Sequence, residues 1–147
     1  MVMMVHKWAA IAASVAMIPA AVPTVATAEN PETSVSLELN DLSDSATGCL
    51  ATFMARNALP QRLDEIAFEV VLFDADGRVD RLLVLDFSPL TRGKTRVRQF
   101  ELEGAECAGI SRVLVNDAAA CSGADVAPHA CIEQLETTVR VPVEFGS

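Results

Sequence analysis

The sequence is poor in the residues that carry out chemistry. Its 147 residues contain no tyrosine, one tryptophan and two histidines, with 11 basic side chains against 20 acidic ones. Beyond the N-terminal segment only His129 remains as a candidate base, and no serine or cysteine lies in a nucleophile motif. The lack of basic tracts and stacking aromatics argues against nucleic acid as a partner. We therefore expect no catalytic site and no cofactor.

Residues 1–28 have the parts of a secretory signal peptide. A short basic start precedes an apolar run from Trp8 to Val22, and the segment ends in the small residues Ala26-Thr27-Ala28. The run is about 15 residues long, whereas a membrane anchor needs about 20, so we expect no membrane span. The sequence predicts cleavage after Ala28 and a periplasmic or secreted product, residues 29–147, that folds as one domain.

The exported part is strongly acidic and contains all four cysteines. Without Lys7 it has 20 acidic and 10 basic groups. In an oxidising compartment, four cysteines in a small domain are typical of two disulfides, which support a core of modest size.

Short runs with a two-residue apolar period, separated by turn residues, recur along this part. Such a pattern is typical of a β-sandwich or barrel. The Asp76-Gly77 pair predicts a hairpin, Asn40-Asp41 predicts a turn after the first strand, and Ala118-Ala119-Ala120 is expected in a loop. We expect an all-β, immunoglobulin-like antiparallel sandwich of about seven strands. The expected strands span 35–39, 49–57, 65–74, 78–87, 95–102, 110–116 and 135–145.

Strand direction selects among the three possible cysteine pairings. The second and sixth strands run the same way in such a sandwich, so Cys49 and Cys107, both near strand starts, share one end. Cys121 follows the sixth strand and Cys131 precedes the seventh, so these two share the other end. A bond between Cys107 and Cys121 would cross about 23 Å of extended chain, against a limit of about 7 Å between bridged Cα atoms. The sequence predicts the disulfides Cys49–Cys107 and Cys121–Cys131.

Three motifs between Asn57 and Phe100 carry a family resemblance. They are Phe68-Glu69-Val70-Val71-Leu72-Phe73-Asp74, the following Asp76-Gly77, and Leu90-Thr91-Arg92-Gly93. With these motifs the stretch resembles FxLYD-type exported immunoglobulin-like modules, although the signature tyrosine is missing. The chain is also similar to small cysteine-containing exported proteins of alphaproteobacteria without an established activity. These resemblances imply an immunoglobulin-like fold and periplasmic residence, and no particular chemistry.

Two clusters of candidate metal ligands have simpler interpretations. Asp74 and Asp76 precede a glycine, but a calcium loop needs a glutamate about six positions later, so backbone hydrogen bonding in a turn is the favoured interpretation. Cys121, His129 and Cys131 could in principle bind zinc or copper. In an oxidising space the two cysteines form a disulfide more often, and we expect no metal.

The basic residues are concentrated in one window. Between positions 78 and 98 lie six of the ten bases that follow residue 28, and that window carries +4 against −14 for the rest of the exported part. Arg92, Lys94, Arg96 and Arg98 alternate, so an extended strand would present them on one face, with Val97 facing the core. The stripe is interpreted either as a solvated edge strand that discourages aggregation, or as a binding site for an anion or acidic partner.

Two functions of different classes remain after these exclusions. The first is a non-catalytic binding or accessory module that contacts a protein or another component of the cell envelope. The second is an acidic inhibitor of a cationic hydrolase such as a lysozyme, attracted to its target by opposite charge. The sequence predicts no particular oligomeric state for either.

Overall fold

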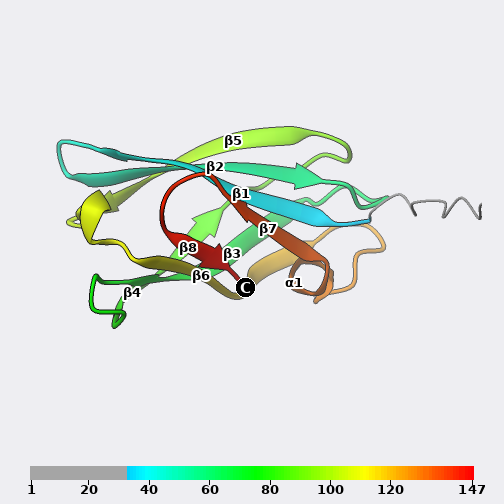
Figure 1. Ribbon diagram of the computed structural model, residues 1–147. Helices are drawn as coiled ribbons and strands as arrows, with labels where there is room; N and C mark the ends of the chain where they lie inside the picture. The colour runs from blue at the N-terminus through cyan, green and yellow to red at the C-terminus, as the bar shows by residue number, and fades with distance from the viewer. Residues whose placement is uncertain (1–32) are drawn as a thin grey trace, which may run out of the picture.

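The computed structural model describes residues 33–147, which form a two-layered β-sandwich (Figure 1). The expected signal peptide lies outside the described residues. No helix within 33–147 is long and apolar enough to cross a membrane. In chain order the elements are β1 (Val35–Asp44), β2 (Gly48–Asn57), β3 (Glu65–Phe73), β4 (Val79–Asp86), β5 (Thr95–Glu103), the short helical turn η1 (Cys107–Gly109), β6 (Arg112–Ser122), α1 (Ala130–Glu133), β7 (Leu135–Val139) and β8 (Glu144–Gly146).

The strands form two sheets of four, ordered β5-β2-β1-β7 and β4-β3-β6-β8. We call them the β2 sheet and the β3 sheet. Neighbouring strands are antiparallel except for the pairs β1–β7 and β6–β8, which are parallel. The first, second and fifth strands share one sheet while the third and sixth share the other, as in immunoglobulin-like sandwiches. The expected all-β sandwich is confirmed.

Alternating burial along the central strands builds the core. On β2 every second residue from Cys49 to Asn57 is buried, so this strand turns one complete face towards the other layer. The ring of Phe53 lies 5.9 to 6.0 Å, between centroids, from the rings of Phe87, Phe100 and Phe145. These side chains come from both sheets and from the link that follows β4. The cluster therefore holds the layers together, and each buried ring contributes about 1.5–3 kcal/mol.

Both disulfides have the predicted pairing. Cys49 is bonded to Cys107 with a Cα–Cα distance of 5.0 Å, and Cys121 is bonded to Cys131 with 5.8 Å. The first joins β2 to the turn that precedes β6, so it connects the two sheets at one end. The second ties the end of β6 to α1 at the opposite end.

β1 is longer than the sequence predicts. A turn was expected at Asn40-Asp41, but the strand continues to Asp44. The register against β2 shifts between Leu39 and Asp41, so Asn40 occupies a bulge. The turn prediction is wrong here because a bulge accommodates an extra residue without ending the strand pairing.

β6 also extends beyond the expected strand. Ala118-Ala119-Ala120, expected in a loop, belongs to β6, and Ala120 pairs with Ala67 of β3. Alanine has little preference for strands, but strand preference depends strongly on context, and pairing with β3 decides the structure here. The one α-helical turn lies later, at Ala130–Glu133. As a result Cys121 lies within β6 instead of after it.

The expected seventh strand is divided between the two sheets. β7 pairs with β1 in the β2 sheet, residues 140–143 cross between the layers, and β8 pairs with β6 in the β3 sheet (Figure 1). Pro142 lies in the crossing, and proline lacks the N–H that a sheet interior requires. The sandwich therefore has eight strands within the described residues, where seven were expected.

Candidate functional site

Two sides of the sandwich bring the edges of the two sheets together. On one side the edge strands are β7 and β8, which are five and three residues long and pack against each other. On the other side they are β4 and β5, with eight and nine residues. We call these the short-edged side and the long-edged side. The basic window from position 78 to 98 covers the long-edged side.

The predicted basic stripe does not exist as one surface. Arg92 and Lys94 are exposed in the turn before β5, whereas Arg96 and Arg98 are half-buried on the inward face of β5. Val97 points outward and exposes 57% of its surface. The prediction that Val97 faces the core and the arginines face solvent is wrong.

Two apolar residues further along β5 determine which way the arginines point. Leu102 is buried, and Phe100 packs against Phe53 and Phe87, so the even-numbered positions face the other sheet. Side chains alternate along a strand, so Arg98 must point the same way. Because β5 is an edge strand, the apolar stem of the arginine covers core residues while its guanidinium reaches the side of the sandwich.

Two arginines bridge the long-edged side. From β5, Nη2 of Arg98 donates to the carbonyl of Ser88, just after β4, at 2.8 Å. From β4, Nη1 of Arg81 donates to the carbonyl of Glu103, at the end of β5, at 2.6 Å, and its Nε pairs with Asp80 at 2.6 Å. The Nε of Arg98 is buried and has no hydrogen-bond partner within residues 33–147. Arginine side chains thus connect the two long edges near opposite ends of the side.

The carboxylate of Asp86 lies beside this bridge. The nearby hydroxyl of Ser88, the backbone N–H of Ser88, which donates to this carboxylate at 2.7 Å, and the charge of Arg98 hold the pKa of Asp86 below the usual 3.8. The hydroxyl is the larger influence and Arg98 the smaller. Asp86 is therefore ionised at neutral pH and offsets one of the six basic charges between positions 78 and 98.

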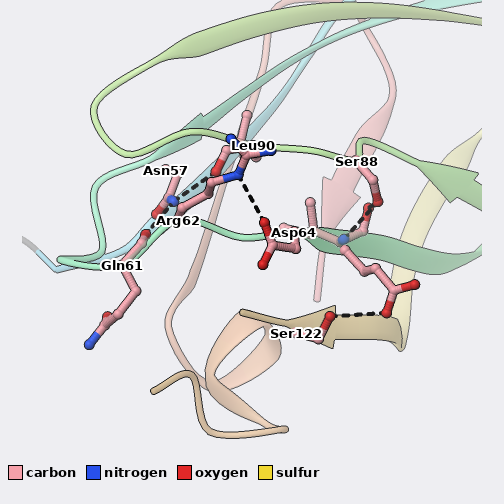
Figure 2. Close-up of polar contacts among 9 residues, drawn as sticks. Asn57, Gln61, Arg62, Asp64, Ser88, Leu90 and Ser122 are labelled. Atoms are coloured by element: carbon pink, nitrogen blue, oxygen red, sulfur yellow. Dashed lines mark hydrogen bonds and ion pairs between the residues drawn. The ribbon is translucent and has the colours of Figure 1, made fainter. Parts of the chain in front are cut away.

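A buried asparagine organises two loops of this side, the one that follows β2 and the one that follows β4. Asn57 is fully buried, and its side-chain amide donates to the carbonyls of Gln61 at 2.8 Å and Leu90 at 3.0 Å (Figure 2). Its side-chain oxygen accepts the backbone N–H of Leu59 at 2.9 Å. The same loops are also joined by backbone hydrogen bonds between Leu63 and Leu90, and the polar atoms of the Asn57 side chain are all used.

The backbone of Asn57 also positions the basic turn. The N–H of Gly93 donates to the carbonyl of Asn57 at 2.7 Å, and the N–H of Asn57 donates to the carbonyl of Lys94 at 3.4 Å. Gly93 has φ of +71°, a conformation that glycine adopts without strain. The exposed bases Arg92 and Lys94 are therefore presented by a turn fixed to the core.

The outward face of β4 is apolar. Val79, Leu82 and Val84 expose 56%, 56% and 61% of their surfaces. Across the sheet, Leu82 pairs with Val71 of β3, which in turn pairs with Leu114 of β6. Leu82, Val71 and Leu114 thus form an apolar row across the outer face of the β3 sheet, next to the long edge.

The two clusters considered for metals have other roles in the structure. One side-chain oxygen of Asp74 accepts the backbone N–H groups of Asp76 and Arg78, both at 2.9 Å, so this aspartate shapes the hairpin turn. Cys121 and Cys131 are joined in a disulfide, and His129 is exposed just before α1. Among the described residues no three histidine, cysteine, aspartate or glutamate side chains are grouped as metal ligands.

The sequence analysis singled out the arginines of β5 but misjudged their direction, and it did not identify the apolar outward face of β4. The signal for the outward face was the unbroken run Leu82-Leu83-Val84-Leu85, because four consecutive apolar residues in a strand must place two on each face. The signal for the arginines was their shared parity with Phe100 and Leu102. Nothing in the sequence marked Arg81 or Ser88 as bridging residues.

Comparisons with family models, with curated proteins and with solved structures find no match to this chain. A functional conclusion therefore depends on the geometry described above.

Proposed function

We propose that the protein is a non-catalytic binding or accessory module of an extracytoplasmic compartment, and that the long-edged side is its contact surface. The compartment is supported by the two disulfides, which form and persist in oxidising surroundings. The partner is a protein or another component of the cell envelope. This function requires a surface and no reactive group.

One observation carries the proposal: charge and apolar surface coincide on the two long edges. Six of the ten bases beyond residue 28 lie between positions 78 and 98, and of the five large exposed apolar residues within 33–147, four lie on β4 and β5. Exposed apolar residues next to a local concentration of basic side chains, on an otherwise acidic molecule, are typical of interaction sites. The arginine bridges also keep this surface in place before a partner binds.

The test is affinity capture from periplasmic extract with a charge-reversed surface. Arg92→Glu with Lys94→Glu changes two exposed turn residues whose side chains make no hydrogen bond or ion pair within residues 33–147. The matched control is Arg112→Glu with Arg140→Glu, which changes the net charge equally at solvent-accessible sites near the short-edged side. Surface ion pairs of this kind contribute little, about 0–1 kcal/mol, so both variants should fold.

We expect the wild type and the control to capture the same partner, more strongly at low salt, and the Arg92→Glu/Lys94→Glu variant to lose it. A partner retained equally by all three proteins would show that this surface is not the contact.

A second function is favoured by the acidic end of the sandwich. Asp44, Glu103 and Glu106 are exposed around the Cys49–Cys107 disulfide, where the ends of β1, β2 and β5 meet. A rigid acidic end suits an inhibitor of a cationic hydrolase such as a lysozyme. In that case the captured protein would be such a hydrolase, Arg92→Glu/Lys94→Glu would bind it at least as well as the wild type, and Asp44→Lys with Glu106→Lys would lose it.

A further inference from the structure

The outer edge of β4 has backbone groups that no strand uses. Within residues 33–147, β4 is the last strand of the β3 sheet on the long-edged side. The N–H of Phe87 donates to the carbonyl of Ile66 in β3, and hydrogen-bonded pairs recur every second residue. The odd-numbered residues of β4 therefore bond to β3, while the N–H and C=O groups of Leu82, Val84 and Asp86 point away from the sheet.

The side chains along this edge differ between its two faces. The outward face presents Leu82 and Val84, both more than half exposed. The inward face opens towards the gap between the sheets, where the guanidinium groups of Arg81 and Arg98 lie and where the buried Nε of Arg98 lacks an acceptor. A strand added to β4 would have apolar neighbours on one face and positive neighbours on the other.

The other long edge is less suited to such an addition. The outward face of β5 presents Val97, Gln99, Glu101 and Glu103, so only one of its neighbours is apolar. On its inward face Arg96 and Arg98 point into the sandwich, and inward charges on an edge strand discourage pairing with another strand. In contrast, β4 has inward charge only at Arg81, and its remaining inward residues are leucines.

We propose that β4 binds an extended segment of a partner protein as an additional strand, and that the segment alternates apolar and acidic side chains. The backbone of Leu82, Val84 and Asp86 supplies the hydrogen bonds, as in strand-addition complexes. The apolar side chains of the segment cover Leu82 and Val84, and its acidic side chains reach Arg81 and Arg98. This inference rests on the proposed function, because it specifies how the long-edged side recognises its partner.

Charge favours a segment of another protein over a second copy of this chain. Two copies paired through β4 would bring Arg81 and Arg98 of one copy next to the same arginines of the other. Like charges in close proximity oppose such an interface. An acidic strand neutralises the same surface instead.

The experiment selects random peptides of about eight to ten residues, the usual length of a strand, on the immobilised full exported protein. We expect enrichment of sequences in which apolar residues alternate with aspartate or glutamate. Replacing the acidic residues of a selected peptide by amides should weaken binding about tenfold or more, and raising salt should weaken the parent peptide.

Two variants test whether the edge of β4 is the site. Val84→Lys places a charge on the outward face, and Val84→Pro removes one outward N–H, a change that edge strands tolerate. The matched control is Val97→Lys, because Val97 of β5 is as exposed as Val84, at 57% against 61%. Both Val84 variants should lose the peptide while Val97→Lys binds it normally. Amide exchange at Leu82 and Val84 should slow on binding.

Each other outcome overturns the inference. Selection that enriches no peptide, peptides without the alternation, or peptides that bind Val84→Lys as well as the wild type exclude strand addition of this chemistry. Concentration-dependent dimers that Val84→Lys abolishes would identify a second copy as the occupant. If periplasmic capture is lost in Arg92→Glu/Lys94→Glu but retained in Val84→Lys, the proposed function stands and the strand-addition mode fails.

Discussion

The two sides of the sandwich manage their sheet edges by different means. On the short-edged side the strands are brief, β7 with five residues and β8 with three, and they pack directly against each other. On the long-edged side, β4 and β5 present eight and nine residues, and the contact between them is made by the side chains of Arg81 and Arg98. Short strands and inward charges are both known ways to prevent unwanted strand pairing.

This difference shows that the four edge strands are not equivalent: some are protected against pairing with another strand, and one is able to bind one. The first half of β5 carries two inward arginines, Arg96 and Arg98. The middle of β4 carries no inward arginine. The short-edged side offers a partner too little backbone to pair with. Only β4 combines length, exposed apolar residues and unused backbone groups, so the contrast between the sides singles out one strand.

The largest loss of stability should follow the removal of the disulfide that joins the two sheets, because on the long-edged side the sheets are connected only through side-chain contacts. Replacing Cys49 and Cys107 together by alanine removes a disulfide with a sequence separation of 58. The loop-entropy model gives a loss of about 4 kcal/mol in the free energy of unfolding. Replacing Cys121 and Cys131, with a separation of 10, should cost about 3 kcal/mol in the same model. Urea unfolding of both variants measures this order, and equal losses would contradict it.

The next largest effect concerns the buried asparagine that holds the loops of the long-edged side. Asn57→Leu keeps the branched shape of the side chain but leaves the N–H of Leu59 and the carbonyl of Gln61 without these partners, and the carbonyl of Leu90 with only the N–H of Leu63. Leaving buried polar groups unpaired costs about 1–3 kcal/mol each, so we expect a loss of about 3 kcal/mol. Asn116→Leu is the control, since Asn116 is exposed with one side-chain hydrogen bond, to Glu69. A loss for Asn57→Leu no larger than the control's would exclude this role.

A smaller effect on stability, with a change in association, is expected from the inward arginines. Arg96→Met with Arg98→Met keeps the long apolar stems and removes a buried nitrogen without an acceptor. Replacing buried charge by apolar groups is often neutral, so the free energy of unfolding should change by less than about 1 kcal/mol. The variant should self-associate more, because β5 loses its protection. Light scattering against Arg62→Met/Arg140→Met checks this, and equal scattering would show that the arginines do not guard the edge.

The smallest effect is a difference between two carboxylates, one on each side. The pKa of Asp86 is held below 3.8 by Ser88 and, to a lesser degree, by Arg98. Near the short-edged side, hydrogen bonds from Asn40 and Arg140 hold the pKa of Glu38 below 4.5. Since both pKa values are lower in the folded state, each contribution to stability is complete above these ordinary values and is lost as the pH falls through the folded value.

Carboxyl titration by NMR distinguishes the two causes at Asp86. Ser88→Ala should raise the pKa of Asp86 more than Arg98→Met does, and neither change should alter the pKa of Glu38. An equal or larger rise in Arg98→Met would mean that charge, and not hydrogen bonding, dominates on the long-edged side.

The sequence was most informative where local patterning and chain direction act together. The Asp76-Gly77 hairpin and the pairing Cys49–Cys107 followed from turn chemistry and from the direction of strands. The division of the last run between two sheets did not, because apolar alternation identifies a strand but does not say which sheet it joins. Pro142 was the available signal for the crossing.

The candidate site was harder to predict because it depends on distant residues. The inward direction of Arg98 is determined by Phe100 and Leu102 on its own strand, and could have been read from their parity. Its contact with Ser88 depends on how the two sheets stack, which no local pattern encodes. The apolar outward face of β4 is also a property of the assembled sheet, since Val71 and Leu114 reach it from other strands.

The brief strands of the short-edged side have a consequence for biosynthesis. β7 and β8 are the last strands of the sandwich to leave the ribosome, and they cover the edges of β1 and β6, which have ten and eleven residues. Until they are synthesised, the sandwich would expose two further long edges. A chain cut before residue 135 would therefore expose the edges of β1 and β6 in addition to those of β4 and β5, and it should aggregate more readily than the whole sandwich.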